Sequence, residues 1–245
     1  MTAAPVPVPV AVAIETATET VGVAVHTSSG LEAEFVLTGR RRHVESLTPA
    51  LEHLLAQVGV ATGDIGVLAV DVGPGLFTGL RVGVAAAKGL AQALGVGVLG
   101  ATSLDILTAG AAEAGHHGHV LACVDARRGE VFASVSRVGA DGAPRAELVA
   151  PGLFAPANLV NALGGLAGVP LPAVGDGAQR YEALLSEVPG VEVVAPALSF
   201  PPPTALLRHA LARLEAGEAP VDAALVVPLY MREADARINF ARART

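Results

Sequence analysis

The stretch Gly73–Ala91, GPGLFTGLRVGVAAAKGLA, is the most specific segment of the sequence. It follows an apolar run, Val67–Val72, which contains Asp71 near its end, and it opens with a Gly-Pro-Gly turn. This order predicts a buried strand, a tight turn and then a helix that Thr78 caps and that runs to about Leu94. A strand that leads directly into a helix is typical of α/β folds.

Small residues recur at every fourth position of this segment. Gly75, Gly79, Gly83 and Ala87 share one side of the predicted helix, so another backbone can approach that side closely. Packing against the chain's own sheet and packing against a partner explain this pattern equally well.

The residues before this segment predict three strands and one helix. The strands are expected at Val10–Ile14, Val21–His26 and Leu31–Leu37, and the first two form a hairpin. Apolar residues at helical spacing predict a helix over Ser46–Val58, with Pro49 in its first turn if Ser46 is the cap.

The residues after the segment repeat part of this scheme. They predict a strand, a helix, a hairpin of two strands and two further helices, at Gly95–Leu99, Thr102–Ala114, His119–Asp125 with Glu130–Arg137, Gln179–Val188 and Thr204–Ala216. Because each half contains a hairpin, the sequence suggests two α/β lobes of duplicated design with mixed sheets. We divide the chain into a Pro-Val lead over 1–9, an N-terminal lobe over 10–105 that carries the candidate partner-binding helices, a smaller and less regular C-terminal lobe over 106–232, and a tail over 233–245.

Composition excludes several classes of protein. The chain has 245 residues, of which 52% are hydrophobic, so it is not a disordered segment. Its 16 basic and 23 acidic residues give a net charge of −7, and aromatic residues are only 3%, so autonomous binding of nucleic acid is not expected. Contact with nucleic acid would have to pass through a partner.

The setting of the protein is expected to be reducing. Cys123 is the only cysteine, so it can form no internal disulfide, and we expect a cytoplasmic protein. The opening residues have no basic region of the kind that begins a signal peptide. The longest uncharged stretch, 151–175, contains four prolines and does not suit a membrane helix.

The common catalytic motifs are missing from the sequence. It has no phosphate-binding P-loop, no nucleophile elbow and no H-E-x-x-H pair. The histidines at 116, 117 and 119 fit a solvated loop better than a metal site, and Cys123 fits a buried apolar position better than a nucleophile. The basic run Arg40–Arg42 fits a solvated helix entry better than an anion site.

Three carboxylates follow or end predicted strands. Glu15, Asp71 and Asp125 stand where α/β folds place groups that bind ligands, and such residues also cap helices and fix turns. Both interpretations stay open.

Several segments, in order, resemble the bacterial TsaB family, whose older name is YeaZ and which takes part in making N6-threonylcarbamoyladenosine beside the anticodon of tRNA. Besides the segment quoted first, they are AIETATETVGVAV at 13–25, RHVESLTPALEHLLAQVGV at 42–60, DARRGEVFASV at 125–135 and VPLYMREADA at 227–236. Two positions depart from the pattern, because Glu15 replaces a common Asp and Met231 a Leu. The Gly/Pro-rich stretch at 139–177 matches nothing in it.

The resemblance implies a two-lobed actin/hexokinase-like (ASKHA) fold and a non-catalytic role. Members of the family bind the transferase TsaD through the N-terminal lobe, can self-associate through the same face, and work with a small ATPase, TsaE. ATP or ADP and a metal are therefore expected on partner subunits, with no cofactor or metal in the isolated chain, and tRNA is expected to bind only through the complex.

The resemblance also selects residues. The expected partner interface uses two helices and consists of His43, Leu47, Leu51, Leu54, Phe77, Thr78, Leu80, Arg81, Val84 and Lys88. A remnant nucleotide loop is expected at Glu15, Thr16, Thr18, Asp71, Gly73 and Gly75.

Two other functions remain as alternatives. A nucleotide-dependent kinase or hydrolase of the actin/hexokinase class would need competent phosphate loops, and the run Glu15–Thr18 lacks the glycine that such loops use. A glycoprotease-type metallopeptidase would need a histidine pair, whereas His43 and His53 are too far apart in sequence to lie on one helical turn.

Overall fold

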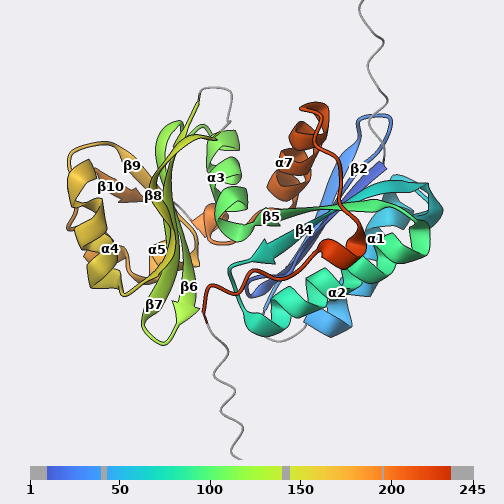
Figure 1. The fold of residues 1–245 in the computed structure, drawn as a ribbon, viewed down its shortest axis with the longest axis horizontal. Helices are drawn as coiled ribbons and strands as arrows, with labels where there is room; N and C mark the ends of the chain where they lie inside the picture. The colour runs from blue at the N-terminus through green and yellow to red at the C-terminus, as the bar shows by residue number, and fades with distance from the viewer. Residues whose placement is uncertain (1–9, 40–42, 140–143, 195, 233–245) are drawn as a thin grey trace, which may run out of the picture.

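The computed structural model describes residues 10–39, 43–139, 144–194 and 196–232, and shows two α/β halves side by side (Figure 1). The first half is built on a mixed sheet of five strands in the order β3-β2-β1-β4-β5. Its three antiparallel strands come first in the chain, and β4 then pairs with β1 and β5 with β4, both in parallel. The strands are β1 (Val10–Glu15), β2 (Thr20–His26), β3 (Glu32–Thr38), β4 (Ile65–Gly73) and β5 (Gly97–Thr102).

The second half repeats this topology. Its sheet has the order β10-β9-β6-β7-β8, so β6 to β10 take the places that β1 to β5 take in the first sheet. Antiparallel pairs again come first and parallel pairs follow, which confirms the predicted duplication. The strands are β6 (Gly118–Arg127), β7 (Glu130–Val138), β8 (Pro144–Phe154), β9 (Leu171–Val174) and β10 (Val191–Val193).

Helices cover both faces of each sheet. α1 and α2 bury an apolar side on one face of the first sheet, and α7 covers the opposite face. α3 packs on the second sheet, which α4 to α6 cover from the other side, and Ile106 of α3 also reaches the cluster beneath α7. The helices are α1 (His43–Val58), α2 (Phe77–Leu94), α3 (Ser103–Glu113), α4 (Pro156–Leu163), α5 (Asp176–Arg180), α6 (Glu182–Leu185) and α7 (Pro203–Glu215).

Residues 221–232, which we call the C-terminal strap, return to the first sheet. Val221 pairs with Val98 of β5, and the strap contains a short 3-10 helix at Ala223–Leu225. It then follows α2 back towards the N-terminal end of that helix, where the Leu229 N–H donates to the Val72 carbonyl at 2.7 Å. The red ribbon of the strap in Figure 1 therefore ends between the two halves.

Several predicted boundaries are wrong. α1 begins at His43 rather than Ser46, and Pro49 lies inside it. α2 begins at Phe77 after the N-cap Leu76, so Thr78 lies in the first turn and is not the cap. Both starts lie at contacts with the turn between β1 and β2, which local sequence does not show: His43 with the Thr18 carbonyl, and Leu76 with the Ala17 carbonyl.

Two longer regions also differ from expectation. The low-signal stretch at 139–177 contains β8, α4 and β9, and the helix expected at 179–188 is divided into α5 and α6. Prolines and glycines weaken the periodic pattern there although tertiary packing forms regular elements. The division between 105 and 106 stays a prediction, and α7, from the range assigned to the second lobe, packs on the first sheet.

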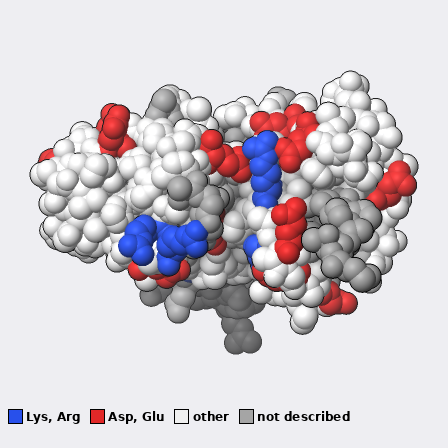
Figure 2. Space-filling model, turned by 90° about the horizontal axis from the view of Figure 1, so that it is seen from above, with Lys and Arg blue, Asp and Glu red and all other residues white. Residues whose placement is uncertain are grey.

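Charged side chains are sparse on the face that Figure 2 shows. Seen from above in Figure 2, acidic and basic groups interleave and no basic band crosses that face. Arg208 of α7, for example, pairs with Glu32 at 2.7 Å and with Glu113 at 2.8 Å. Among the described helices, none combines the length and the apolar character that crossing a bilayer needs.

Candidate functional site

Half of the residues expected at a partner interface are buried, and the other half are half-buried or exposed. The chain's own core covers five of them, whereas Leu51 and Lys88 are half-buried and Phe77, Thr78 and Arg81 are exposed. The buried five are His43, Leu47, Leu54, Leu80 and Val84, whose exposed fractions run from 1% to 8%. The five buried side chains are not available for direct contact with a partner, and the exposed members of the set stay candidates for that contact.

The stripe of small residues packs inside the first lobe. A Cβ at Gly75 or Gly79 would collide with the carbonyl oxygen of Ala17 or Thr16, and one at Gly83 would collide with the Thr16 hydroxyl. The Leu76 N–H also donates to the Ala17 carbonyl at 2.6 Å. Of the two explanations for the stripe, packing within the chain is the one that the structure supports.

His43 joins α1 to the same turn. Its Nε2 lies 2.8 Å from the Thr18 carbonyl oxygen, so this ring nitrogen carries the hydrogen and donates it. His43 also lies beside Gly79. The turn between β1 and β2 is thus enclosed by the first residues of both α1 and α2.

Two carboxylates are buried beneath this turn. Glu15 and Asp71 are at most 1% exposed, and the Glu15 carboxylate accepts the Ala17 N–H at 3.0 Å. Burial and the negative charge of Asp71 raise the pKa of Glu15 well above its ordinary value. Burial raises the pKa of Asp71 to about 6, although Gly73 N–H and the Ser103 hydroxyl donate to its Oδ1 at 2.6 and 2.8 Å.

Glu15 and Asp71 thus form a closed pair, by which we mean two carboxyl groups that are buried by the chain itself and are not open to a ligand. Oδ2 of Asp71 has no hydrogen-bond partner within the described residues, and the raised pKa values of Glu15 and Asp71 favour the protonated form of these buried carboxyl groups. The remnant-loop residues Glu15, Thr16, Thr18, Asp71 and Gly73 are buried and Gly75 is half-buried. The structure brings the predicted set together, and the chain itself fills the space around it.

The second lobe holds a matching pair. Asp125, near the end of β6, and Asp176, after β9, take the places of Glu15 and Asp71 in the repeated topology. Asp176 accepts the Asp125 N–H at 2.8 Å, and burial raises the pKa of Asp176 to about 6. Unlike the first pair, Asp125 is bound by arginines, Arg127 at 2.8 Å and Arg180 at 3.3 Å.

Arg127 connects the two halves. Its guanidinium donates to Asp125 of its own hairpin and to Glu19 of the first lobe, the latter at 2.6 Å. Arg127 and Glu19 border a hollow of about 790 Å³ at the N-terminal ends of α1 and α2. Three predicted interface residues, His43, Phe77 and Thr78, meet in its lining.

An aromatic stack that the sequence analysis missed lies at the start of α2. The Phe77 and Tyr230 rings are 5.1 Å apart, and the Arg81 guanidinium lies 3.7 Å from the centre of the Phe77 ring. Nε of Arg81 donates to the Tyr230 hydroxyl at 3.0 Å. The only available signal for Tyr230 was its position in the motif at 227–236, because sequence spacing does not place the strap beside α2.

The remaining sequence candidates have structural explanations. Cys123 is fully buried, and burial raises the pKa of its thiol, so it behaves as a small apolar residue. Among the described residues, no group of three His, Cys, Asp or Glu side chains is arranged to hold a metal ion. The arginines at 40–42 lie outside the described residues.

Comparison with known proteins gives a consistent result. The model of a family described as TsaD, tRNA N6-adenosine threonylcarbamoyltransferase, matches residues 33–240. The tRNA threonylcarbamoyladenosine biosynthesis protein TsaB of Escherichia coli is 37% identical over 110 residues, which are 45% of this chain and 47% of that protein. The chain thus spans about half the length of this curated relative.

Solved structures extend the likeness over almost the whole chain. YeaZ from Pseudomonas aeruginosa has a TM-score of 0.77 and 27% identity, over 91% of this chain and 99% of that one. The activator of 2-hydroxyisocaproyl-CoA dehydratase from Clostridium difficile, solved with bound ADPNP, has a TM-score of 0.51 and 10% identity over 85% of this chain and 96% of that one. The second likeness concerns the fold alone and agrees with the predicted actin/hexokinase-like class.

The family model covers most of the chain, and the motif order, the relatives and the YeaZ structure all agree with it. The chain therefore belongs to the TsaB (YeaZ) group of the TsaD family.

Proposed function

We propose that this protein acts in the formation of N6-threonylcarbamoyladenosine next to the anticodon of tRNA, as a non-catalytic subunit that binds and activates a TsaD-like transferase in the cytoplasm. Membership of the TsaB group supports the pathway. The relative from E. coli is named for the same modification.

The closed state of the first-lobe carboxylates is the observation that carries the non-catalytic role. Glu15 and Asp71 stand at the strand ends where this fold class binds ligands, yet both are buried, and Gly75 lies directly on the backbone of Ala17. A phosphate group would have to displace that contact.

The other expected partners follow from the same role. The net charge of −7 supports contact with tRNA only through the complex, and a TsaE-like ATPase is the proposed third component. ATP or ADP and a metal would be held by the partner subunits. A homodimer through the α1–α2 face would compete with the transferase for one surface.

Reconstitution tests the proposal directly. The chain would be purified together with the TsaD of its own organism, and threonylcarbamoyl transfer to tRNA would be measured with and without it. We expect a one-to-one complex whose transfer activity needs this chain, and no turnover by the chain alone. Failure to form a complex, or turnover and tight magnesium-dependent ATP binding by the isolated chain, would overturn the proposal in favour of the kinase or hydrolase.

A further inference from the structure

Exposed apolar side chains gather along the C-terminal strap. Four of its apolar side chains are exposed, Leu225 by 70%, Val227 by 66%, Leu229 by 41% and Tyr230 by 44%. Phe77, which is 41% exposed, continues this row onto the start of α2. Solvent-exposed apolar rows of this kind mark surfaces that another molecule covers.

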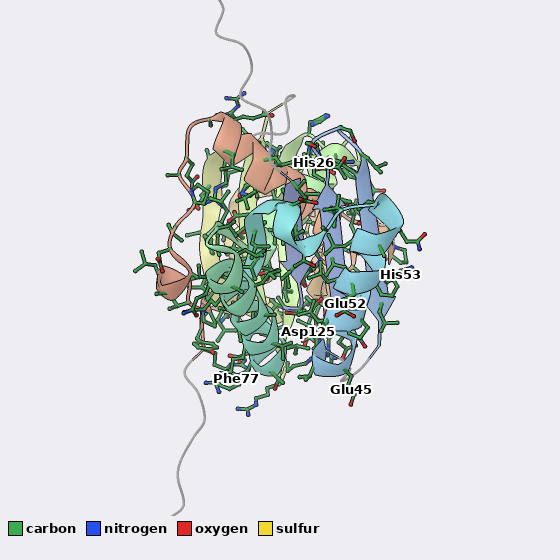
Figure 3. All side chains as sticks on the ribbon, turned by 90° about the vertical axis from the view of Figure 1, so that its right-hand side faces the viewer. His26, Glu45, Glu52, His53, Phe77 and Asp125 are labelled. Carbon is green, nitrogen blue, oxygen red and sulfur yellow. The ribbon has the colours of Figure 1, made fainter. Side chains whose placement is uncertain are left out.

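The backbone of the strap is fixed, so these side chains cannot turn inward. The single lysine, Lys88, donates from Nζ to the Ala224 and Val226 carbonyls at 3.1 and 2.9 Å. Val226 is 5% exposed and packs into the core, whereas Leu225, at the end of the 3-10 helix, and Val227 are exposed on either side of it. Figure 3 shows α2 lying between this strap and α1.

The Arg81 stack adds a fixed positive charge at one end of the row. The Phe77 ring and the Tyr230 hydroxyl hold the guanidinium plane in place. In the described part of the chain, the Nη1 and Nη2 groups of Arg81 make no hydrogen bond to protein. A planar guanidinium with free Nη donors suits a carboxylate, which it can bind through two parallel hydrogen bonds.

We propose that the strap and the first turn of α2 form one docking surface for the transferase partner, which covers the apolar row and places a carboxylate side chain on Arg81. This inference rests on the proposed function and extends the partner surface beyond the two helices to the strap. Charge complementarity supports a protein partner that presents a carboxylate, because Lys88 donates to strap carbonyls and Arg232 to the Ala126 carbonyl, whereas Arg81 makes only the Nε bond to Tyr230 among the described residues. Rigid aromatic and arginine side chains are also the residue types that dominate binding energy at interfaces.

Binding of the TsaD from the same organism, measured by titration calorimetry against the full chain and its variants, tests the surface. Arg81→Ala and Val227→Asp are each expected to weaken binding by about tenfold or more. Arg81→Lys keeps the charge but not the planar fork, so it should also bind about tenfold more weakly. Tyr230→Phe keeps the ring and removes the hydroxyl that orients Arg81, and a loss of about threefold is expected.

Leu148→Asp is the matched control. Leu148 is 42% exposed, close to the 41% of Phe77, but lies on β8 of the second lobe, so its substitution should leave the affinity unchanged. The altered side chains are exposed or partly exposed, and the thermal midpoint of every variant should stay close to that of the unaltered chain. A raised salt concentration should weaken the unaltered complex more than the Arg81→Ala complex.

Each outcome separates the two proposals. If the unaltered chain binds the transferase and the strap and Arg81 variants bind equally well, the docking surface is overturned while the proposed function stands. If the unaltered chain does not bind, the proposed function fails and the docking surface fails with it. If the same variants disrupt only a dimer of this chain, the occupant is a second copy and the assignment to the transferase is overturned.

Discussion

Gly79 determines how closely α2 approaches the β1–β2 turn. Its missing side chain leaves room for the Thr16 carbonyl oxygen, with which an added Cβ would collide. Gly89 of the same helix has nothing within 4 Å of an added Cβ. The two glycines therefore occupy one helix for different reasons, and only the first is required by packing.

Opposite effects on stability are expected at these two positions. Gly79→Ala should lower the free energy of unfolding by about 1–3 kcal/mol or more, because the backbone of the turn must move. Gly89→Ala should raise it by about 0.5–1 kcal/mol, because alanine favours the helix. Urea unfolding of both variants checks this, and an equal effect at the two sites would contradict the packing described at Gly79.

Glu15 makes stability depend on pH. Burial and the charge of Asp71 raise the pKa of Glu15 in the folded state, and the pKa of Asp71 is itself raised to about 6. From about pH 4 upwards, through pH 6, the folded state therefore holds more protons than the unfolded state. Stability from this pair is therefore present at low pH and is lost as pH rises, by up to ~1.4 kcal/mol per pH unit for each proton.

Glu15→Gln should flatten that dependence. Glutamine cannot ionise, it can accept the same backbone N–H, and its amide can donate to the unpartnered Oδ2 of Asp71. Relative to the unaltered chain, the variant should gain stability as pH rises from 5 to 8. Urea midpoints across this range measure the difference, and parallel curves for the two proteins would show that Glu15 does not hold the extra proton.

At the scale of elements, α2 has a buried side and an exposed side. Val84 is 3% exposed and belongs to the core, whereas Ala85, the next residue, is exposed. Val84→Arg should therefore destabilise the fold by several kcal/mol, because it buries an unpaired charge (about 3 kcal/mol or more). Ala85→Arg should leave stability within about 0.5 kcal/mol and weaken transferase binding. Thermal unfolding and a binding titration separate the two, and soluble, folded Val84→Arg would contradict the core position.

Lys88 fixes the strap to α2. Lys88→Met keeps the apolar stem but loses both donations to strap carbonyls. Backbone amides of the strap, including that of Leu229, should then exchange hydrogen faster, while amides of α7 should not change. Hydrogen-exchange mass spectrometry checks this, and unchanged protection of the strap would show that its other contacts are sufficient.

The sequence predicts elements better than it predicts their exposed sides. Periodicity located α1, α2 and the hairpins, because apolar spacing reports which residues are buried somewhere. Apolar spacing does not show whether the chain's own core or a partner buries a residue. For this reason the sequence analysis places Leu47 and Val84 at a partner interface, although they pack in the core. Tyr230 was missed as a site residue because its contact with Arg81 joins residues 149 positions apart.

At the scale of the whole molecule, the first lobe depends on the end of the chain. α7 covers one face of its sheet, and the strap pairs with β5 and crosses α2. A fragment of residues 10–105 lacks both and leaves the apolar face around Ala13 and Leu99 bare. We expect this fragment to be unfolded or aggregated on its own, and poor dispersion in an NMR spectrum would show it. A well-folded fragment would contradict the dependence on α7.

The return of α7 and the strap to the first sheet has a consequence for biosynthesis. The ribosome releases β1 to β5 first, but α7, which covers the second face of their sheet, emerges only after β6 to β10 have been translated as well. Until then the nascent chain carries an open apolar sheet that chaperones would have to shield. A premature stop codon shortly before α7 would therefore harm the part of the protein that was made first.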